Sequence, residues 1–237
     1  MTAEIKSALG MQFDPEKREF SDTLAGILNH LSILDWQLPS SAVINPLWCV
    51  REIAGIGEGL FDDRIYAVEN PLSAFSTLTA ICHGDLHGDN ILCSSLETGV
   101  PRPVLVDFET THDGHICRDF ARLEAAILCQ SFSWSTVELT EVAKWFDESL
   151  TGDVYHPPKS ANSSDAIQRA VTGVGKLRSI SAGCGQQLWP LTNEEYKLAL
   201  LAALLPIVRY DGLQISNRVL ALVLSSCVAS SLTTDFS

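Results

Sequence analysis

Positive charge and paired cysteines are both scarce in this 237-residue chain. It has 16 Lys and Arg residues against 29 Asp and Glu residues, a formal net charge of −13 and a pI near 4.7. This charge repels a phosphate backbone and an anionic bilayer surface, so general nucleic-acid binding is disfavoured. The seven cysteines are odd in number and include no Cys-x-x-Cys pair, which favours reduced, mostly buried thiols in a cytoplasmic protein.

Long apolar segments are missing as well. The first ten residues carry Glu4 and lack the apolar centre of a signal peptide. The longest apolar run, residues 198–208, is too short to span a bilayer and contains Pro206. The sequence therefore predicts neither export nor membrane insertion. With 46% hydrophobic and 19% charged residues, the chain can fold around a core without a disulfide or a metal.

Apolar residues at helical spacing dominate the chain. Helices are expected at residues 20–34, after Pro71, and at 118–130, 136–150, 193–205 and 219–228. Ser135 with Glu138, and Thr192 with Glu195, have the spacing of capping boxes. Two short apolar runs, 91–93 and 104–106, predict a hairpin with a wide loop, and a second loop is expected around Gly114. The predicted fold class is α+β, mainly α.

The most polar segment is HGDLHGDN, residues 83–90, which leads directly into the first strand of the predicted hairpin. The second strand ends in VLVDFE, and hairpin pairing would bring Asp107 near Asn90. Phosphoryl transfer needs an aspartate that orients the acceptor hydroxyl, and an amide with a second aspartate that holds Mg²⁺. The two segments are therefore expected to converge in one site, with Asp85, Asn90 and Asp107 facing one cavity.

HGDLHGDNIL followed by VLVDFE resembles the aminoglycoside phosphotransferase and choline kinase-like superfamily. The downstream Gly114-His115 and the segment DFARLE, residues 119–124, resemble most closely the kinase-like ternary complex associated domains of bacterial signalling and conflict systems. The resemblance implies a protein-kinase-like C-terminal lobe over residues 80–237, whose short β-hairpin carries the metal site. Residues 1–79 would form a helical or irregular leading segment in which no N-terminal lobe is recognisable.

The resemblance also implies roles for the polar loop residues. Asp85 would be the catalytic aspartate, assisted by His83, which would brace the loop, and by His87, which would face the phosphates. Asn90 and Asp107 would bind Mg²⁺ and, through it, ATP.

Three further residues lie on the helix expected next. By the same resemblance, Asp119 would give structural support by accepting hydrogen bonds from the loop backbone or from His83. The alternative is a solvated ion pair between Asp119 and Arg122, with a structural role only, and Glu124 is expected to be a surface or bracing residue.

A glycine-rich loop and a strand lysine, which kinases use to hold the phosphates, are not recognisable. Lys6 and Lys17 are the only lysines before residue 83, and GIGEG at residues 55–59 has no lysine after it. The sequence thus predicts ATP- and Mg²⁺-dependent phosphate transfer to a hydroxyl acceptor, either a small molecule or a protein. Activity of this chain alone should be low, because a missing N-terminal lobe or a protein partner would have to complete the site.

Three alternatives stay open. A kinase-like lobe without transfer activity would serve as a docking or regulatory module of a multicomponent system. A metallophosphoesterase would use Asp85 and His87 as metal ligands, although the chain has no Gly-Asn-His segment. A zinc site would draw on residues whose spacing fits no usual pair of ligands: Cys82, His83, His112, His115 and Cys117.

Overall fold

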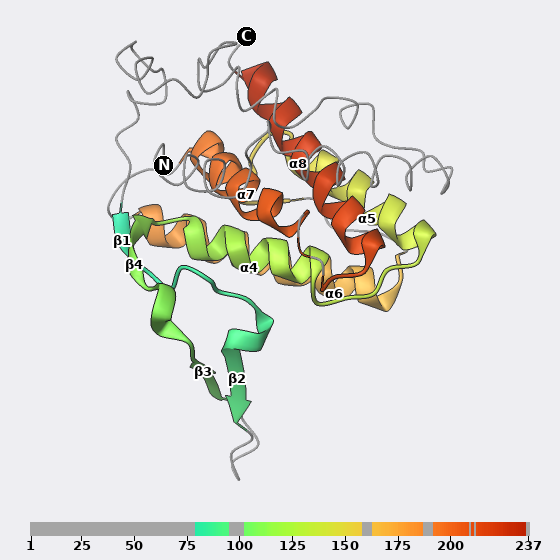
Figure 1. Ribbon diagram of the computed structural model, residues 1–237. Helices are drawn as coiled ribbons and strands as arrows, with labels where there is room; N and C mark the ends of the chain where they lie inside the picture. Colours follow the sequence, from blue (N-terminus) through green and yellow to red (C-terminus); the bar gives the residue numbers. More distant parts are fainter. Residues whose placement is uncertain are drawn as a thin grey trace, which may run out of the picture.

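The computed structural model of the protein describes residues 79–94, 102–157, 163–186, 192–208, 210 and 212–235. These residues form a layered group of helices with two small antiparallel sheets at one end (Figure 1). The helices are α4 (Arg118–Cys129), α5 (Thr136–Ser149), α6 (Asp165–Gln186), α7 (Asn193–Ile207) and α8 (Ile215–Asp235). The strands are β1 (Thr79–Cys82), β2 (Ile91–Ser94), β3 (Arg102–Leu105) and β4 (His112–His115). The predicted class, α+β and mainly α, is confirmed.

The hydrophobic core lies among the helices rather than against the sheets. Helix α7 packs between α4 and α8, and α5 and α6 complete the group. Leu200, Leu204, Val219 and Leu224 are fully buried where these helices meet. Burial of one such side chain contributes about 1.5–3 kcal/mol, so the contacts between these helices stabilise the described part of the fold.

Helix α8 is long and apolar enough to cross a membrane by length and composition alone. Its window Ile215–Leu232 has a mean hydropathy of 1.5, yet 72% of that window is buried inside the fold. The side chains of α8 pack against α5 and α7, which is the environment of a core helix.

Both predicted capping boxes are present. The Ser135 hydroxyl accepts from the Glu138 backbone N–H, and the Glu138 carboxylate accepts from the Ser135 backbone N–H at 3.0 Å. Thr192 and Glu195 make the same reciprocal pair at the start of α7. Each box satisfies two backbone donors that a helix N-terminus leaves unpaired, so α5 and α7 begin where the sequence predicts.

The predicted hairpin is confirmed, with Ile91 opposite Leu105 and Leu92 opposite Val104 in the β2–β3 ladder. The loop expected around Gly114 is wrong, because residues 112–115 form β4, which pairs with β1. The polar segment HDGH has no alternating apolar pattern. Its strand conformation comes from pairing with residues 30 to 36 positions away, and no local signal reveals that.

Glu124, expected at the surface or as a bracing residue, is fully buried. Its carboxylate receives hydrogen bonds from Arg178 on α6 and from the Tyr196 hydroxyl on α7. The surface interpretation is therefore wrong, and Glu124 links three helices from the middle of α4.

Several sequence predictions concern residues outside the described ranges. These are the helices at 20–34 and after Pro71, the leading segment up to residue 78, Lys6, Lys17 and the glycines of residues 55–59.

Candidate functional site

Asp119, in the first turn of α4, forms hydrogen bonds to the start of the polar loop, residues 83–90. Its Oδ2 accepts a hydrogen bond from the His83 backbone N–H at 2.6 Å, and its Oδ1 accepts one from the Gly84 N–H at 3.0 Å. These are the contacts expected of Asp119 from the sequence. A carboxylate at the N-terminus of a helix also interacts favourably with the helix dipole, so one side chain fixes the loop and stabilises α4.

His83 is buried and braces the loop against the end of the hairpin. Its Nε2 lies 2.8 Å from the carbonyl oxygen of Val106, and its ring centroid lies 5.0 Å from that of Phe108. The Thr110 hydroxyl donates to the His83 carbonyl oxygen at 2.9 Å. His83 therefore connects the loop to the segment that contains Asp107.

Asp85 forms an ion pair with Arg122, one turn after Asp119 on α4. The Arg122 Nε and Nη2 atoms lie 3.1 and 3.0 Å from the Asp85 Oδ1. The Asp85 side chain is 41% exposed, whereas that of Arg122 is 14% exposed. The predicted solvated pair between Asp119 and Arg122 is wrong, because each of the two side chains contacts the loop instead. The i,i+3 spacing was the available sign that both residues lie on one face of α4.

His87 and Asn90 converge on Asp85. The amide nitrogen of Asn90 donates to the Asp85 carbonyl oxygen at 2.9 Å and lies 3.3 Å from the His87 Nε2. That same Nε2 lies 3.5 Å from the Asp85 Oδ2. The loop therefore folds back on itself, with the three residues close together and Asn90 buried beneath the partly exposed Asp85.

The hairpin brings Asp107 beside Asn90. The Val106 backbone N–H donates to the Asn90 carbonyl oxygen at 3.1 Å, so Asp107 directly follows the residue bonded to Asn90. Asp107 has a φ of 63°, in the left-handed region that non-glycine residues seldom occupy. Such a conformation costs about 1–3 kcal/mol and tends to occur at functional sites. The Asp107 residue is exposed to solvent.

The donor chemistry of Asn90 and Asp107 fits Mg²⁺. This ion prefers oxygen ligands and usually takes only one or two protein carboxylates besides phosphates and water. Because Asn90 uses its amide nitrogen to bond to Asp85, its side-chain oxygen remains available as a ligand. These two residues are the ones that would hold the ion.

Zinc and dinuclear metal sites fit less well. Among the described residues, no three or more His, Cys, Asp or Glu side chains are grouped so that they could hold a metal. That search covers the zinc candidates Cys82, His83, His112, His115 and Cys117. It also covers Asp85 and His87, which gain no further His, Cys, Asp or Glu ligand of the kind that a metallophosphoesterase requires.

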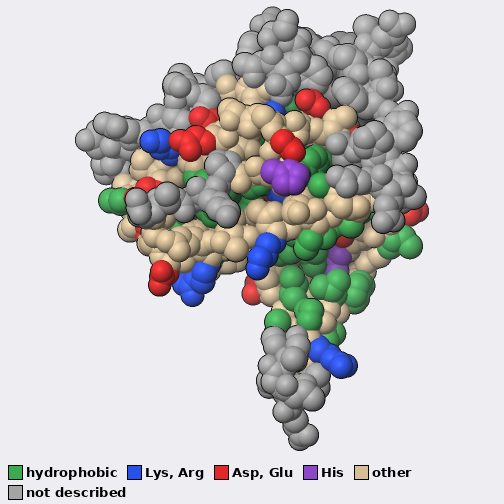
Figure 2. Space-filling view, turned by 180° about the vertical axis from the view of Figure 1, so that it is seen from behind, with side chains coloured by type: hydrophobic (Ala, Val, Ile, Leu, Met, Phe, Trp, Pro, Cys, Tyr) green, Lys and Arg blue, Asp and Glu red, His purple; other side chains and the backbone are tan. Residues whose placement is uncertain are grey.

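The hairpin beside the loop presents apolar side chains to solvent. Figure 2 shows hydrophobic side chains gathered over the part of the molecule that projects from the helices. Leu92, Val104, Leu105 and Phe108 are all exposed, and Phe108 retains 56% of its accessible surface. A continuous apolar patch at the edge of a polar site commonly marks a surface that another molecule covers.

Comparison with known proteins identifies the family. Neither a curated protein nor a solved structure matches the chain. The family model described as ternary complex associated domain 9 matches residues 62–218, which include the polar loop, Asp107 and Asp119. The chain therefore belongs to the ternary complex associated domain 9 family.

Proposed function

We propose that the polar loop and Asp107 form the site of an ATP- and Mg²⁺-dependent phosphotransferase that acts on a hydroxyl acceptor. The observation that carries this proposal is the partly exposed carboxylate of Asp85, which lies on a loop that Asp119 holds in place through two backbone hydrogen bonds. A general base must combine access to the substrate with a defined position. Asp85 meets both requirements.

The contacts of Asp85 assign different tasks to its two oxygens. Arg122 holds Oδ1, whereas Oδ2 has only the longer contact to the His87 Nε2 at 3.5 Å and would receive the proton of the acceptor hydroxyl. As that proton moves to Asp85, the hydroxyl oxygen forms a bond to the terminal phosphorus of ATP, and the bond from that phosphorus to ADP breaks. Positioning and charge stabilisation contribute most of the catalysis in this chemistry.

Asn90 and Asp107 would hold Mg²⁺. The ion would neutralise charge on the phosphates when it is bound. His87 lies between Asn90 and the Asp85 Oδ2, a position from which it can face a phosphate group.

A second lobe or a partner protein completes this site in our proposal. The described lysines, Lys144, Lys176 and Lys197, lie on α5, α6 and α7, and none of them is on a strand next to the polar loop. The exposed apolar side chains of β2, β3 and Phe108 are a suitable surface for the added part. We expect the chain alone to bind Mg²⁺ and ATP weakly and to turn over slowly.

A second candidate function is a docking or regulatory module without transfer activity. The family description, ternary complex associated domain, favours a role within an assembly. The exposed apolar patch of Leu92, Val104, Leu105 and Phe108 favours the same role. In this case the hairpin would bind a partner, and Asp85 would contribute to the stability of the loop only.

The decisive experiment is a single-turnover assay of the full chain with labelled ATP and Mg²⁺, with ADP as the measured product. We expect slow ADP formation that falls about 10²–10⁴-fold in Asp85→Asn, because a general base contributes that much. The control is Asp113→Asn, which removes an exposed carboxylate from β4 and should leave the rate unchanged. Equal rates in Asp85→Asn and the parent chain would overturn the proposal.

A binding measurement separates the two candidates. Fluorescent ATP should bind to the chain in the presence of Mg²⁺, and Asp107→Asn should weaken that binding. If no ATP binds at millimolar concentration, the phosphotransferase proposal fails and the docking module becomes the better account.

A further inference from the structure

Helix α4 is the support on which the polar loop lies (Figure 1). Asp119 near its start bonds to the loop backbone, and Arg122, one turn later, bonds to the Asp85 side chain. Arg122 makes one more contact, which the proposed function does not use. Its third guanidinium nitrogen, Nη1, donates to the side-chain oxygen of Gln130 at 3.3 Å. Gln130 is therefore connected to Asp85 through a single side chain.

Gln130 has a fixed position directly after the last residue of α4. Its backbone N–H donates to the Ala126 carbonyl oxygen at 2.8 Å. The backbone N–H and the hydroxyl of Ser131 donate to the same oxygen at 3.0 and 3.2 Å. Arginine has donors only, so the Gln130 amide must present its oxygen to Arg122. The end of the helix thus holds an acceptor in place for the guanidinium.

The Arg122 guanidinium places two donors on one oxygen of Asp85. Arginine and a carboxylate frequently pair through two parallel bonds, one to each oxygen. Here the Arg122 Nε and Nη2 lie 3.1 and 3.0 Å from Oδ1, whereas Oδ2 lies 3.5 Å from the His87 Nε2. Because the guanidinium is planar and rigid, the position of Nη1 also determines where Nε and Nη2 point. The bond to Gln130 therefore constrains which oxygen of Asp85 is engaged.

Limited access of solvent strengthens this constraint. The Arg122 side chain is 14% exposed, and Gln130 is partly buried. A hydrogen bond from a charged group is stronger in such surroundings than in water. We therefore expect the bond between Arg122 and Gln130 to persist in solution.

We propose that Gln130 is a positioning residue that keeps the Arg122 guanidinium on Oδ1 of Asp85 and so leaves Oδ2 for the acceptor hydroxyl. Without Gln130, the guanidinium would be free to turn in its plane and to form one bond to each oxygen. An N–H donor would then occupy the oxygen that receives the hydroxyl proton, and ADP formation would slow. This inference rests on the proposed function, because the task of Oδ2 comes from the phosphotransferase reaction.

The kinetic test compares Gln130→Leu with the parent chain in the single-turnover assay with labelled ATP and Mg²⁺. Leucine is similar in size to glutamine but has no acceptor. We expect the rate at saturating ATP to fall about tenfold, since a hydrogen bond to a charged group is lost. The ATP concentration that gives half the maximal rate should not change, because Gln130 is not among the residues that would hold Mg²⁺ and ATP. Gln130→Glu keeps an oxygen for Arg122 and should retain most of the rate.

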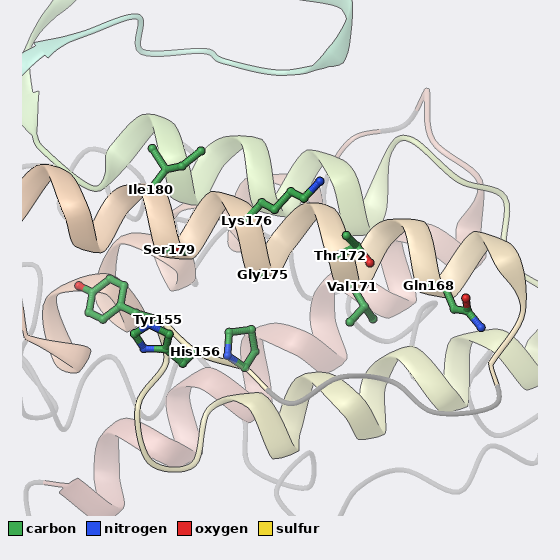
Figure 3. Close-up of a pocket in the computed structure, with 10 residues that line it drawn as sticks. Tyr155, His156, Gln168, Val171, Thr172, Gly175, Lys176, Ser179 and Ile180 are labelled. Carbon is green, nitrogen blue, oxygen red and sulfur yellow. The ribbon is translucent and has the colours of Figure 1, made fainter.

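Gln168→Leu is the matched control. Figure 3 shows Gln168 at one end of the row of α6 residues that line a hollow of about 690 Å³, and this lining shares no residue with the polar loop. The Gln168 side-chain nitrogen donates to the Ser163 carbonyl oxygen at 3.0 Å, so the control also loses one glutamine hydrogen bond. Its rate should equal that of the parent chain, and thermal unfolding verifies that each variant is folded.

A double variant tests whether Gln130 acts through Arg122. Arg122→Ala removes the guanidinium and should slow ADP formation by itself. Gln130→Leu should cause no further loss in that background, because the two residues act through one contact. A further tenfold loss would show that Gln130 acts by another route and would overturn the inference.

A crystal structure of Gln130→Leu tests the contact without any turnover. We expect the Arg122 guanidinium to contact both oxygens of Asp85, and a guanidinium that stays on Oδ1 alone would overturn the inference. A parent-like rate in Gln130→Leu, when Asp85→Asn is slow, would overturn it as well. If Asp85→Asn and the parent chain form ADP equally fast, the phosphotransferase proposal fails. A turned guanidinium would in that case still support Gln130 as the residue that sets the contact between Arg122 and Asp85.

Discussion

Arg178 and Glu124 form a bidentate ion pair in the interior of the helical group. The Arg178 Nε donates to the Glu124 Oε2 at 2.9 Å, and its Nη2 donates to Oε1 at 2.6 Å. Both side chains are completely inaccessible to solvent. The remaining Arg178 donor reaches the Ser149 carbonyl and hydroxyl oxygens and the Val154 carbonyl oxygen, so every charged group of the pair has hydrogen-bond partners.

Removal of Arg178 alone should destabilise the fold strongly. Arg178→Met leaves the Glu124 carboxylate buried without its counter-ion, and such a loss costs about 3–5 kcal/mol. The free energy of unfolding in urea measures the effect.

The double variant Glu124→Gln/Arg178→Met should recover part of the loss, because no uncompensated charge remains. Arg169→Met, on the exposed face of the same helix, is the control and should change stability by less than about 0.5 kcal/mol. A single variant as stable as the parent would contradict this prediction.

Asp119→Ala should loosen the polar loop without unfolding the helices. The change removes the acceptor for the His83 and Gly84 backbone N–H groups, each of which is then left without its charged partner. Loss of such bonds costs about 1–3 kcal/mol. Amide hydrogen exchange should therefore accelerate at residues 83 and 84 and remain slow in α7. The control is Asp113→Ala on β4, which removes a carboxylate outside this contact. If this variant accelerates exchange at residues 83 and 84 to a similar extent, the effect is not specific to Asp119.

Gly84→Ala should destabilise the loop in a way that a change at Thr110 cannot repair. Gly84 has a φ of +89°, and a Cβ at this position would lie 2.3 Å from the Thr110 carbonyl oxygen. Because the obstacle is a backbone atom, Thr110→Ala in the same chain should give no rescue. Gly88→Ala is the matched control, since a Cβ at Gly88 would meet nothing within 4 Å. Thermal unfolding of the three variants and the parent measures the difference. Similar melting temperatures for Gly84→Ala and Gly88→Ala would show that the close approach does not constrain the loop.

Local sequence signals predicted the parts of the fold that depend on local interactions. The capping boxes at Ser135 and Thr192, the helix of residues 118–129 and the β2–β3 hairpin all follow from residues close together in the chain. Strand β4 and the burial of Glu124 were not predicted, since both depend on distant partners. No local sequence pattern around Glu124 indicates its buried partner Arg178, which is 54 residues away.

The candidate site was predictable in its members but not in all its contacts. The grouping of residues 83–90 could be anticipated from motif spacing, and the anchoring contact of Asp119 from the family resemblance. Arg122 as the partner of Asp85 could not, because i,i+3 spacing on a helix is equally consistent with a solvent-exposed pair. Asp107 adopts its left-handed backbone conformation in the turn after β3, and the sequence has no glycine at this position that would predict it.

Acid should weaken the start of α5 through Glu138. Hydrogen bonds from the Ser135 backbone, the Ser135 hydroxyl and the Ser164 hydroxyl stabilise the ionised carboxylate and hold the pKa of Glu138 below its ordinary value of 4.5. A folded-state pKa below the unfolded one gives a contribution that is fully present above pH 4.5 and is lost as the pH falls through the folded value.

Glu138→Gln should therefore reduce the free energy of unfolding at pH 6 and flatten its decline between pH 5 and about pH 3. The comparison is a set of urea unfolding curves for parent and variant across this range. Other depressed carboxylates, such as Asp153, contribute equally to both proteins and cancel in the difference. Glu141→Gln removes an exposed charge from the same helix without touching the capping box, which controls for net charge. If the parent and Glu138→Gln lose stability in parallel as the pH falls, the capping carboxylate is not the group that titrates.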